Sequence, residues 1–375
     1  MALSLLSYDV TDLCLGKPPL RCLSASSSSV SDAIAALKSS EDPFLSVWNC
    51  NHDHEDVTEC ECLGKISMAD VICHCHLSKD EVHTLSALNS PVSVLLPTTR
   101  SLVLHVQPSC SLVEAIDLII QGAQNLIVPI QRKTTTKKKQ QNDNVSVTTT
   151  ITTHSNGQRF CWITQEDIVR FLLGCIAAFS PLPSMSISDL GIINSSHAIL
   201  AVDYNSSASA VVSAISRALA DQTSVAVISP MTLTCCDETA AAAVATLSAG
   251  DLMEYVDGVN PPESLVQEVR DRLESRGLMG LLSLLDSLSL SSPTSSGYSS
   301  DEESPARSFG RSMSMSTRMA RKAEAVVCNP KSSLMAVMIQ AITHRTNYTW
   351  VIDKDGCFVG MVTFVDILKI FRKFL

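Results

Sequence analysis

The sequence carries little charge and no excess of basic residues. Charged side chains make up 18% of the 375 residues, and 28 Lys and Arg stand against 38 Asp and Glu, so the formal net charge is -10. A protein that neutralises a phosphate backbone needs a basic surface. We therefore expect no nucleic-acid partner.

Long apolar runs and a secretion signal are also missing. The longest apolar stretch covers residues 171–179 and ends before Ser180 and Pro181, well short of the roughly 20 residues that a membrane-spanning helix needs. No basic segment followed by an apolar one marks the chain for secretion. We expect no membrane partner, a cytoplasmic location with the nucleus as an alternative, and reduced thiols for the 14 cysteines.

Motifs of nucleophilic catalysis and of phosphate binding by a glycine loop are absent. The chain contains neither a Gly-x-Ser-x-Gly elbow nor a Gly-x4-Gly-Lys loop. We predict that it is not an enzyme.

A helix start, in contrast, occurs four times. It reads Ser, an apolar residue, two free positions, a small apolar residue and another apolar residue, and helical apolar spacing follows each copy. Serine caps a helix by accepting a bond from an otherwise unpaired backbone N–H. The four copies, which predict four similar helices, begin at Ser29, Ser111, Ser207 and Ser333.

A second pattern lies downstream of the first. A short apolar strand is followed by Ser or Thr, two further residues, Asp and an apolar helix. In the last copy, two apolar runs at residues 348–353 and 357–362 flank Asp355-Gly356, which favours a tight hairpin turn. Each unit is therefore predicted to be strand, helix, hairpin, helix. The plain copies are Ser67 with Asp70, Thr164 with Asp167, and Thr363 with Asp366.

The third unit departs from this pattern. Only ten positions separate Ser224 from Thr234, against fourteen from Thr349 to Thr363, and no turn residues divide two strands. We expect one hairpin strand to be missing. Thr234 and Asp237 are then a degenerate copy of the Thr-x-x-Asp pattern.

This order of elements resembles the cystathionine-β-synthase (CBS) domain, whose repeats pair into Bateman modules. The last repeat matches the family pattern best, from Asn329-Pro330 through Ser333-Leu334 to residues 360–368. The layout resembles plant four-CBS proteins of the CBSX type and, more distantly, kinase γ subunits. The resemblance implies an α+β fold of four βαββα CBS repeats that form two Bateman modules, with the third repeat incomplete.

The predicted organisation follows from the repeats and the segments between them. The insertion and the linker are rich in polar residues and bury too little to stay ordered. The predicted parts are repeat 1 at 9–79, repeat 2 at 98–180 with a disordered loop at 132–158, a degenerate repeat 3 at 186–258, linking helices at 259–288, a disordered linker at 289–322, and repeat 4 at 323–375.

The strand-to-helix junctions are the candidate ligand sites. Unpaired N–H groups at a helix start attract phosphate or ribose oxygens, and the Asp can accept from ribose hydroxyls. The resemblance implies an adenosyl ligand there, which is AMP, ADP, ATP or S-adenosylmethionine. The alternative is a simple capping arrangement. Kinase γ subunits commonly hold phosphates with His or Arg before the first hairpin strand, but here only Arg345 lies nearby, so we expect a ligand with few phosphates. The candidate residues are Ser67, Asp70, Thr164, Asp167, Thr363 and Asp366.

A group of thiols and imidazoles between residues 52 and 76 offers the ligand types that zinc prefers. Its spacing matches no Cys-x2-Cys pair, and its members fall on both sides of a predicted strand. We therefore predict no metal site. The group comprises His52, His54, Cys60, Cys62, Cys73, His74, Cys75 and His76.

Taken together, these patterns predict a non-enzymatic regulatory protein whose paired repeats sense an adenosyl ligand and modulate a protein partner, with a kinase as one candidate. The alternative is a ligand-free scaffold or a γ-like subunit of an SNF1-related kinase. A homodimer formed through the CBS modules is a further option.

Overall fold

A computed structural model of the chain describes residues 8–40, 42–50, 60–77, 87–96, 103–130, 154, 158–195, 203–221, 230–257, 261–289 and 325–375. The predicted disordered loop at 132–158 and linker at 289–322 lie almost entirely outside the described residues. Among the described helices, none combines the length and apolarity that crossing a bilayer requires.

Repeats 1, 2 and 4 each form a three-stranded sheet with two helices. In every sheet the first strand pairs parallel with the second, and the second pairs antiparallel with the third. The predicted βαββα unit is confirmed in these three repeats. Repeat 1 has β1 (Cys22–Ser24), α2 (Val30–Lys38), β2 (Phe44–Asn49), β3 (Glu61–Ser67) and α3 (Met68–Leu77). Repeat 2 has β4 (Val103–His105), α5 (Leu112–Ile120), β5 (Asn125–Ile130), β6 (Arg159–Thr164) and α6 (Gln165–Gly174). Repeat 4 has β7 (Val327–Cys328), α14 (Leu334–Thr343), β8 (Tyr348–Ile352), β9 (Phe358–Thr363) and α15 (Phe364–Phe374).

The regular elements of repeat 3 among its described residues are all helices, and the segment around Ser224 where the shortened hairpin was predicted lies outside the described residues. Thr234 is the last residue of a short helix and Asp237 follows in a turn, so this pair does not form a strand-to-helix junction. The alanine-rich α9 is completely buried, because its small side chains let the neighbouring helices approach closely. The helices are α7 (Ala208–Asp221), α8 (Pro230–Thr234), α9 (Ala240–Thr246) and α10 (Ala249–Asp257), followed by α11 (Glu263–Ser275) and α12 (Met279–Ser289).

The four serine-led helix starts lie in equivalent surroundings. A short segment runs antiparallel to each of them through backbone hydrogen bonds. The segment at α1 (Val10–Leu13), which precedes repeat 1, lies against Ser111 of repeat 2, and the segment at η2 (Val92–Leu95), which precedes repeat 2, lies against Ser29 of repeat 1. The repeats of the first module therefore exchange their leading segments.

The second module makes the same exchange. The segment that precedes repeat 3 lies against Ser333 of repeat 4 through Ser186, and it follows η4 (Ile176–Phe179) and η5 (Leu182–Ser184). Ser248, at the start of α10, lies against Ser207 of repeat 3. Repeats 3 and 4 therefore exchange their leading segments as repeats 1 and 2 do, although the described residues of repeat 3 contain no strand.

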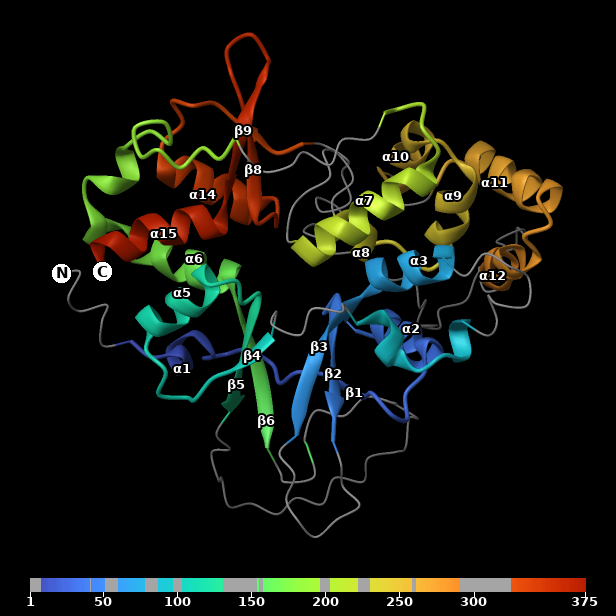
Figure 1. Cartoon of the computed structure of the whole chain (residues 1–375), viewed down its shortest axis with the longest axis horizontal. Coiled ribbons are helices and arrows are strands. Elements are labelled where there is room, and N and C mark those ends of the chain that lie inside the picture. Colours follow the sequence, from blue (N-terminus) through green and yellow to red (C-terminus); the bar gives the residue numbers. More distant parts are fainter. Residues whose placement is uncertain are drawn as a thin grey trace, which may run out of the picture.

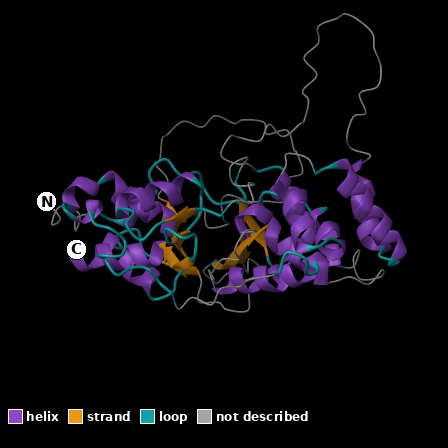
Figure 2. Cartoon of the chain, turned by 90° about the horizontal axis from the view of Figure 1, so that it is seen from above, coloured by secondary structure: helices purple, strands orange, loops and turns teal. Residues whose placement is uncertain are grey.

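The four repeats occupy four quarters of the molecule (Figure 1). One core joins repeats 1 and 3 with α11 and α12, and another joins repeats 2 and 4. Seen from above, the strands lie in the middle, with helices toward both ends (Figure 2). The helices α3 and α6, each of which follows the third strand of its sheet, pack against the second module: α3 on α7, α8 and α9, and α6 on α14 and α15.

A salt bridge between Lys38 of α2 and Glu238 joins repeats 1 and 3, and the Glu238 side chain is 7% exposed. Changing Lys38 to Met leaves a buried carboxylate without its cation, so we expect the free energy of unfolding to fall by about 1–3 kcal/mol. The double variant Lys38→Met with Glu238→Met should recover most of that loss, since it leaves no unpaired charge. Urea denaturation of the wild type and these two variants measures this, and equal losses in the single and double variants would contradict the contact between Lys38 and Glu238.

Candidate functional site

The three predicted Ser/Thr–Asp pairs occupy the same position in their repeats. Ser67, Thr164 and Thr363 each end the third strand of a sheet and precede a helix. Each also pairs with the first residue of the middle strand, which is Phe44, Asn125 and Tyr348 in turn. The pattern therefore identified equivalent strand-to-helix junctions.

At each junction the aspartate closes the helix start. Its Oδ2 accepts the backbone N–H and the hydroxyl of the Ser or Thr at 2.8 and 2.7 Å for Asp70, 2.7 and 2.8 Å for Asp167, and 3.1 and 2.7 Å for Asp366. This is the capping arrangement that the sequence left open as an alternative. The cap bonds use only Oδ2, so capping does not require the other carboxylate oxygen, Oδ1.

The two junctions of the first module share a group of charged residues from both repeats. Lys65, on β3, donates to Asn125 Oδ1 at 3.3 Å across the repeat boundary and lies 4.0 Å from the centre of the Phe44 ring. Lys17, which follows α1, forms an ion pair with Asp167 at 2.5 Å and donates to the carbonyl oxygen of Trp162 at 2.8 Å. The first-module polar cluster consists of Lys17, Asp42, Lys65, Asp70, Asn125 and Asp167.

Burial acts on the charges of this cluster. It raises the pKa of the Asp70 carboxyl, although the hydrogen bonds from Ser67 oppose that shift. It lowers the pKa of the Lys65 ammonium group, against the opposing charges of Asp42, Asp70 and Asp167. Burial also raises the pKa of Asp42. Charges that are partly removed from water interact more strongly with one another and with a bound ligand.

The cations of this cluster were missed by the sequence analysis, which searched immediately before the middle strand. Lys65 comes instead from the third strand, two residues before Ser67, where the other repeats have Trp162 and Met361. Lys17 comes from the segment that repeat 1 contributes to repeat 2. Alignment of the three third strands would have singled out Lys65, whereas no local signal points to Lys17.

The second module has one such junction among its described residues. Asp366 Oδ1 lies 3.8 Å from Lys369 Nζ, and Tyr348, Trp350 and Met361 form a small buried hydrophobic cluster on the adjoining strands β8 and β9. The backbone of Asn194 exchanges two hydrogen bonds with Met361. Gly360 permits this approach, since a Cβ there would lie 2.7 Å from the Asn194 carbonyl oxygen. No strand-to-helix junction from the described part of repeat 3 faces Thr363.

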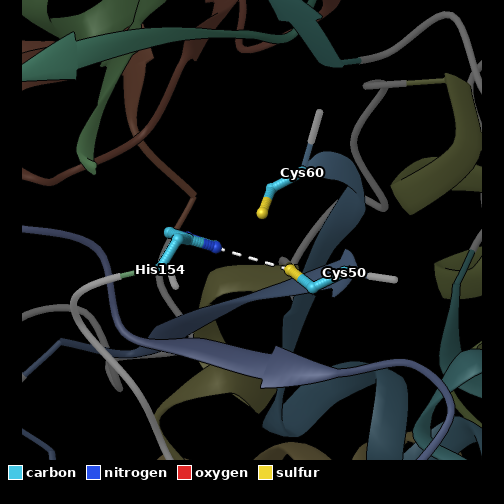
Figure 3. A group of neighbouring side chains, drawn as sticks. All are labelled: Cys50, Cys60 and His154. Atoms are coloured by element: carbon cyan, nitrogen blue, oxygen red, sulfur yellow. Dashed lines mark hydrogen bonds between the residues drawn. The ribbon is translucent and has the colours of Figure 1, made fainter. Parts of the chain in front are cut away.

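The described members of the thiol and imidazole group between residues 52 and 76 do not come together as one site. Cys60 and Cys62 lie in a small core beside Trp48, whereas Cys73 and Cys75 lie in the core between repeats 1 and 3. His52 and His54 lie outside the described residues. The structure instead places Cys60 beside Cys50 and His154, with the two sulfurs and one ring nitrogen all within 4.8 Å of one another (Figure 3).

No disulfide links any of the 14 cysteines, all of which are among the described residues. Burial raises the pKa of Cys22 to about 11 and that of Cys50 to about 12, the latter helped by the neighbouring Cys60 thiol. These two groups are therefore protonated thiols near neutral pH in the structure as it stands.

Comparison with known proteins identifies the repeats. The family described as CBS domain matches residues 316–373, which cover nearly all of repeat 4. The CBS domain-containing protein CBSX5 of Arabidopsis thaliana is 78% identical over 392 residues, which cover 100% of this chain and 99% of the relative. The CBS domain-containing protein CBSX6 of the same plant is 27% identical over 432 residues, covering 100% of this chain and 95% of the relative.

A solved structure shares the fold. Protein MJ1225 from Methanocaldococcus jannaschii, a proposed archaeal homologue of g-AMPK, superimposes with a TM-score of 0.53 at 12% identity, covering 97% of this chain and 100% of the other. The βαββα units, their pairing and the near-complete match to a plant relative lead to one conclusion. The chain belongs to the CBS domain family and is a CBS-domain regulatory protein of the CBSX type.

Proposed function

We propose that this protein is a non-catalytic sensor whose first module binds an adenosyl ligand and passes its binding state to a partner protein. The observation that carries the proposal is the first-module polar cluster. Two strand-to-helix junctions from different repeats contribute to it, together with two lysines. A ligand that contacts both junctions would bridge repeats 1 and 2.

The groups in the cluster suit an adenosyl ligand. The starts of α3 and α6 carry unpaired backbone N–H groups and positive dipole ends, which favour phosphate or carboxylate oxygens. Oδ1 of Asp70 and of Asp167, which the caps do not use, can accept from ribose hydroxyls. Capping and ligand binding are therefore compatible at the same aspartate.

The charge balance of the cluster favours ligands with few phosphates. The cations of this region already act on its carboxylates, since Lys17 pairs with Asp167, and Lys65 and Arg21 both act on Asp42. A triphosphate would have to take Lys17 from Asp167 and would still find little compensating charge. We expect AMP or S-adenosylmethionine to bind more tightly than ATP.

A route from ligand to partner follows from the packing of two helices. The helices that begin at the two junctions, α3 and α6, are the same helices that contact the second module. A ligand that binds one relative placement of α3 and α6 more tightly than others shifts the population toward that placement. The contacts with repeats 3 and 4 then change with ligand occupancy, which alters the surface offered to a partner.

A ligand-free scaffold, or a γ-like kinase subunit without a bound nucleotide, is the second candidate. One observation favours it: Lys17 already neutralises Asp167, and both junction aspartates are engaged in caps. In that case the cluster stabilises the module and the protein acts through its surface alone.

Titration calorimetry of the full chain with AMP, ATP and S-adenosylmethionine separates the two candidates. Changing Asp167 to Ala should lower the affinity about 10-fold or more, because a hydrogen bond to a charged group is lost. The matched control is Asp32→Ala, since Asp32 closes an identical cap with Ser29 at the start of α2, and α2 begins beside the segment at residues 90–96.

Both variants should lose a helix cap, about 0.5–2 kcal/mol. Asp167→Ala also loses the ion pair with Lys17 and should therefore be the less stable of the two, and only Asp167→Ala should lose ligand. A folded wild-type protein that gives no heat with any of the three ligands would contradict sensing at this site and support the scaffold.

A further inference from the structure

We propose that Cys50, Cys60 and His154 bind one zinc ion and thereby join repeat 1 to the insertion of repeat 2. The sequence predicts no metal in this region, because the spacing of its thiols and imidazoles matches no Cys-x2-Cys pair and they lie on both sides of a predicted strand; Cys50 and His154 are not in that group. Cys50 follows β2 and Cys60 precedes β3, so they face each other where the hairpin of repeat 1 opens. His154 belongs to the segment between β5 and β6 of repeat 2.

The distances fit a tetrahedral zinc site. Zinc bonds of about 2.3 Å to sulfur and about 2.0–2.1 Å to nitrogen place tetrahedral ligand atoms roughly 3.6–3.8 Å apart. Cys50 Sγ and His154 Nδ1 lie 3.4 Å apart, and all three ligand atoms lie within 4.8 Å of one another. Small side-chain movements are enough to bring the atoms to bonding distance. Two thiolates and one imidazole are the ligand types that favour zinc over calcium or magnesium.

The hydrogen bonds of His154 direct the correct ring nitrogen at the two thiols. Cys22 donates its S–H to the Leu20 carbonyl oxygen at 3.6 Å, so its sulfur can accept from His154 Nε2, which lies 3.5 Å away. A neutral imidazole that carries its proton on Nε2 presents the Nδ1 lone pair, and Nδ1 faces Cys50 (Figure 3). A second partner that fixes the tautomer of a histidine is a usual feature of metal sites.

The imidazole is also held in place by aromatic packing. Its ring centre lies 4.4 Å from that of Trp48 and 5.2 Å from that of Phe160, and the His154 residue is 2% exposed. The backbone N–H of His154 donates to Gln158 at 3.0 Å, which fixes the chain just before β6. A histidine from a segment that is otherwise rich in Lys and Thr is thus buried next to two thiols of another repeat.

Zinc would stabilise the first module across its repeat boundary. Two ligands come from the sheet of repeat 1 and the third from repeat 2, so the ion adds a cross-link between them. Because binding favours the arrangement in which the three ligands meet, it should raise the melting temperature of the folded protein.

Metal content and affinity of the full chain test this site. The protein is reduced, stripped with a chelator and titrated with Zn²⁺ against a chromophoric competitor, and Co²⁺ is used in parallel as a spectroscopic probe. We expect one ion per chain, a thiolate-to-cobalt charge-transfer band and tetrahedral ligand-field absorption. Removing a residue that only hydrogen-bonds a metal ligand typically lowers metal affinity roughly 10–100-fold. Cys60→Ser and His154→Ala each remove a ligand itself, so we expect each to lower the zinc affinity by at least that factor.

The matched control is Cys357→Ser, because Cys357 precedes β9 as Cys60 precedes β3 but is exposed and lies in repeat 4. It should bind zinc as the wild type does. If Cys60→Ser fails to fold, Cys50→Ser is compared with Cys357→Ser instead, because a thiolate charge-transfer band that survives the loss of Cys50 does not come from this site.

Reduced, folded wild-type protein that binds no zinc in this titration would overturn the proposal. Zinc binding that survives both Cys60→Ser and His154→Ala would overturn it as well. A sample that binds no zinc but forms a Cys50–Cys60 disulfide on oxidation would show that the cysteines are a redox pair instead.

Discussion

Changing Phe371 to Ala should lower the free energy of unfolding by about 3–5 kcal/mol, the usual result of removing a fully buried aromatic ring. Phe371 lies on α15, is 0% exposed, and belongs to the core that repeats 2 and 4 share. Its ring meets Phe179 edge to face, with the ring centres 4.7 Å apart and an interplanar angle of 88°. The cavity left by alanine would therefore lie between the two modules.

Phe374 provides a control on the same helix. It is 51% exposed, and surface substitutions usually change stability by less than about 0.5 kcal/mol. Guanidinium denaturation followed by circular dichroism compares Phe371→Ala with Phe374→Ala. Equal, small losses in both variants would show that α15 is not packed between repeats 2 and 4 as described.

The second large effect is expected for Trp48→Ala, again about 3–5 kcal/mol. Trp48 lies on β2 of repeat 1 and is 0% exposed, and its ring packs 4.7 Å from Phe160 of repeat 2. Its Nε1–H donates to Ser46 Oγ at 2.8 Å. The side chain therefore supports both the sheet of repeat 1 and its contact with repeat 2.

Trp48→Phe separates these contributions. It keeps an aromatic ring against Phe160 but removes the hydrogen bond and some volume, so we expect a smaller loss than for alanine. Thermal and chemical unfolding of both variants measure the difference. If Trp48→Ala unfolds at the wild-type denaturant concentration, the contact between repeats 1 and 2 is not the one described.

Local signals explain why most of the fold could be predicted. The Ser-led helix starts and the Ser/Thr-x-x-Asp junctions are capping patterns that span four to six residues, so they can be read without knowledge of the tertiary structure. The shortened spacing between Ser224 and Thr234 predicts that repeat 3 lacks one hairpin strand, and because Ser224 lies outside the described residues this stays a prediction. The structure confirms the predicted βαββα unit in repeats 1, 2 and 4.

The exchange of leading segments could not be predicted in the same way. The segment at Asp9 was assigned to repeat 1 from its position in the sequence, yet its backbone pairs with Ser111 of repeat 2. Such a pairing depends on which face each repeat leaves open after folding. No pattern within a few residues encodes it, and the predicted domain limits therefore stay a prediction.

The same reason accounts for what the site analysis missed. Lys17 reaches Asp167 only because α1 lies on repeat 2, and His154 of repeat 2 meets Cys50 of repeat 1 although 104 positions separate them in the sequence. The junction aspartates were found from local sequence, whereas their partners were not. Long side chains from distant segments complete both the polar cluster and the proposed zinc site.

Hydrogen exchange of the full chain, measured with and without AMP or S-adenosylmethionine, tests most directly whether the two junctions of the first module form one ligand site. We predict slower exchange of the first-turn amides of both α3 and α6 when ligand is present, with no change at the start of α2, which has the same cap. Protection at only one of the two helices, or equal exchange at both with saturating ligand, would contradict the account.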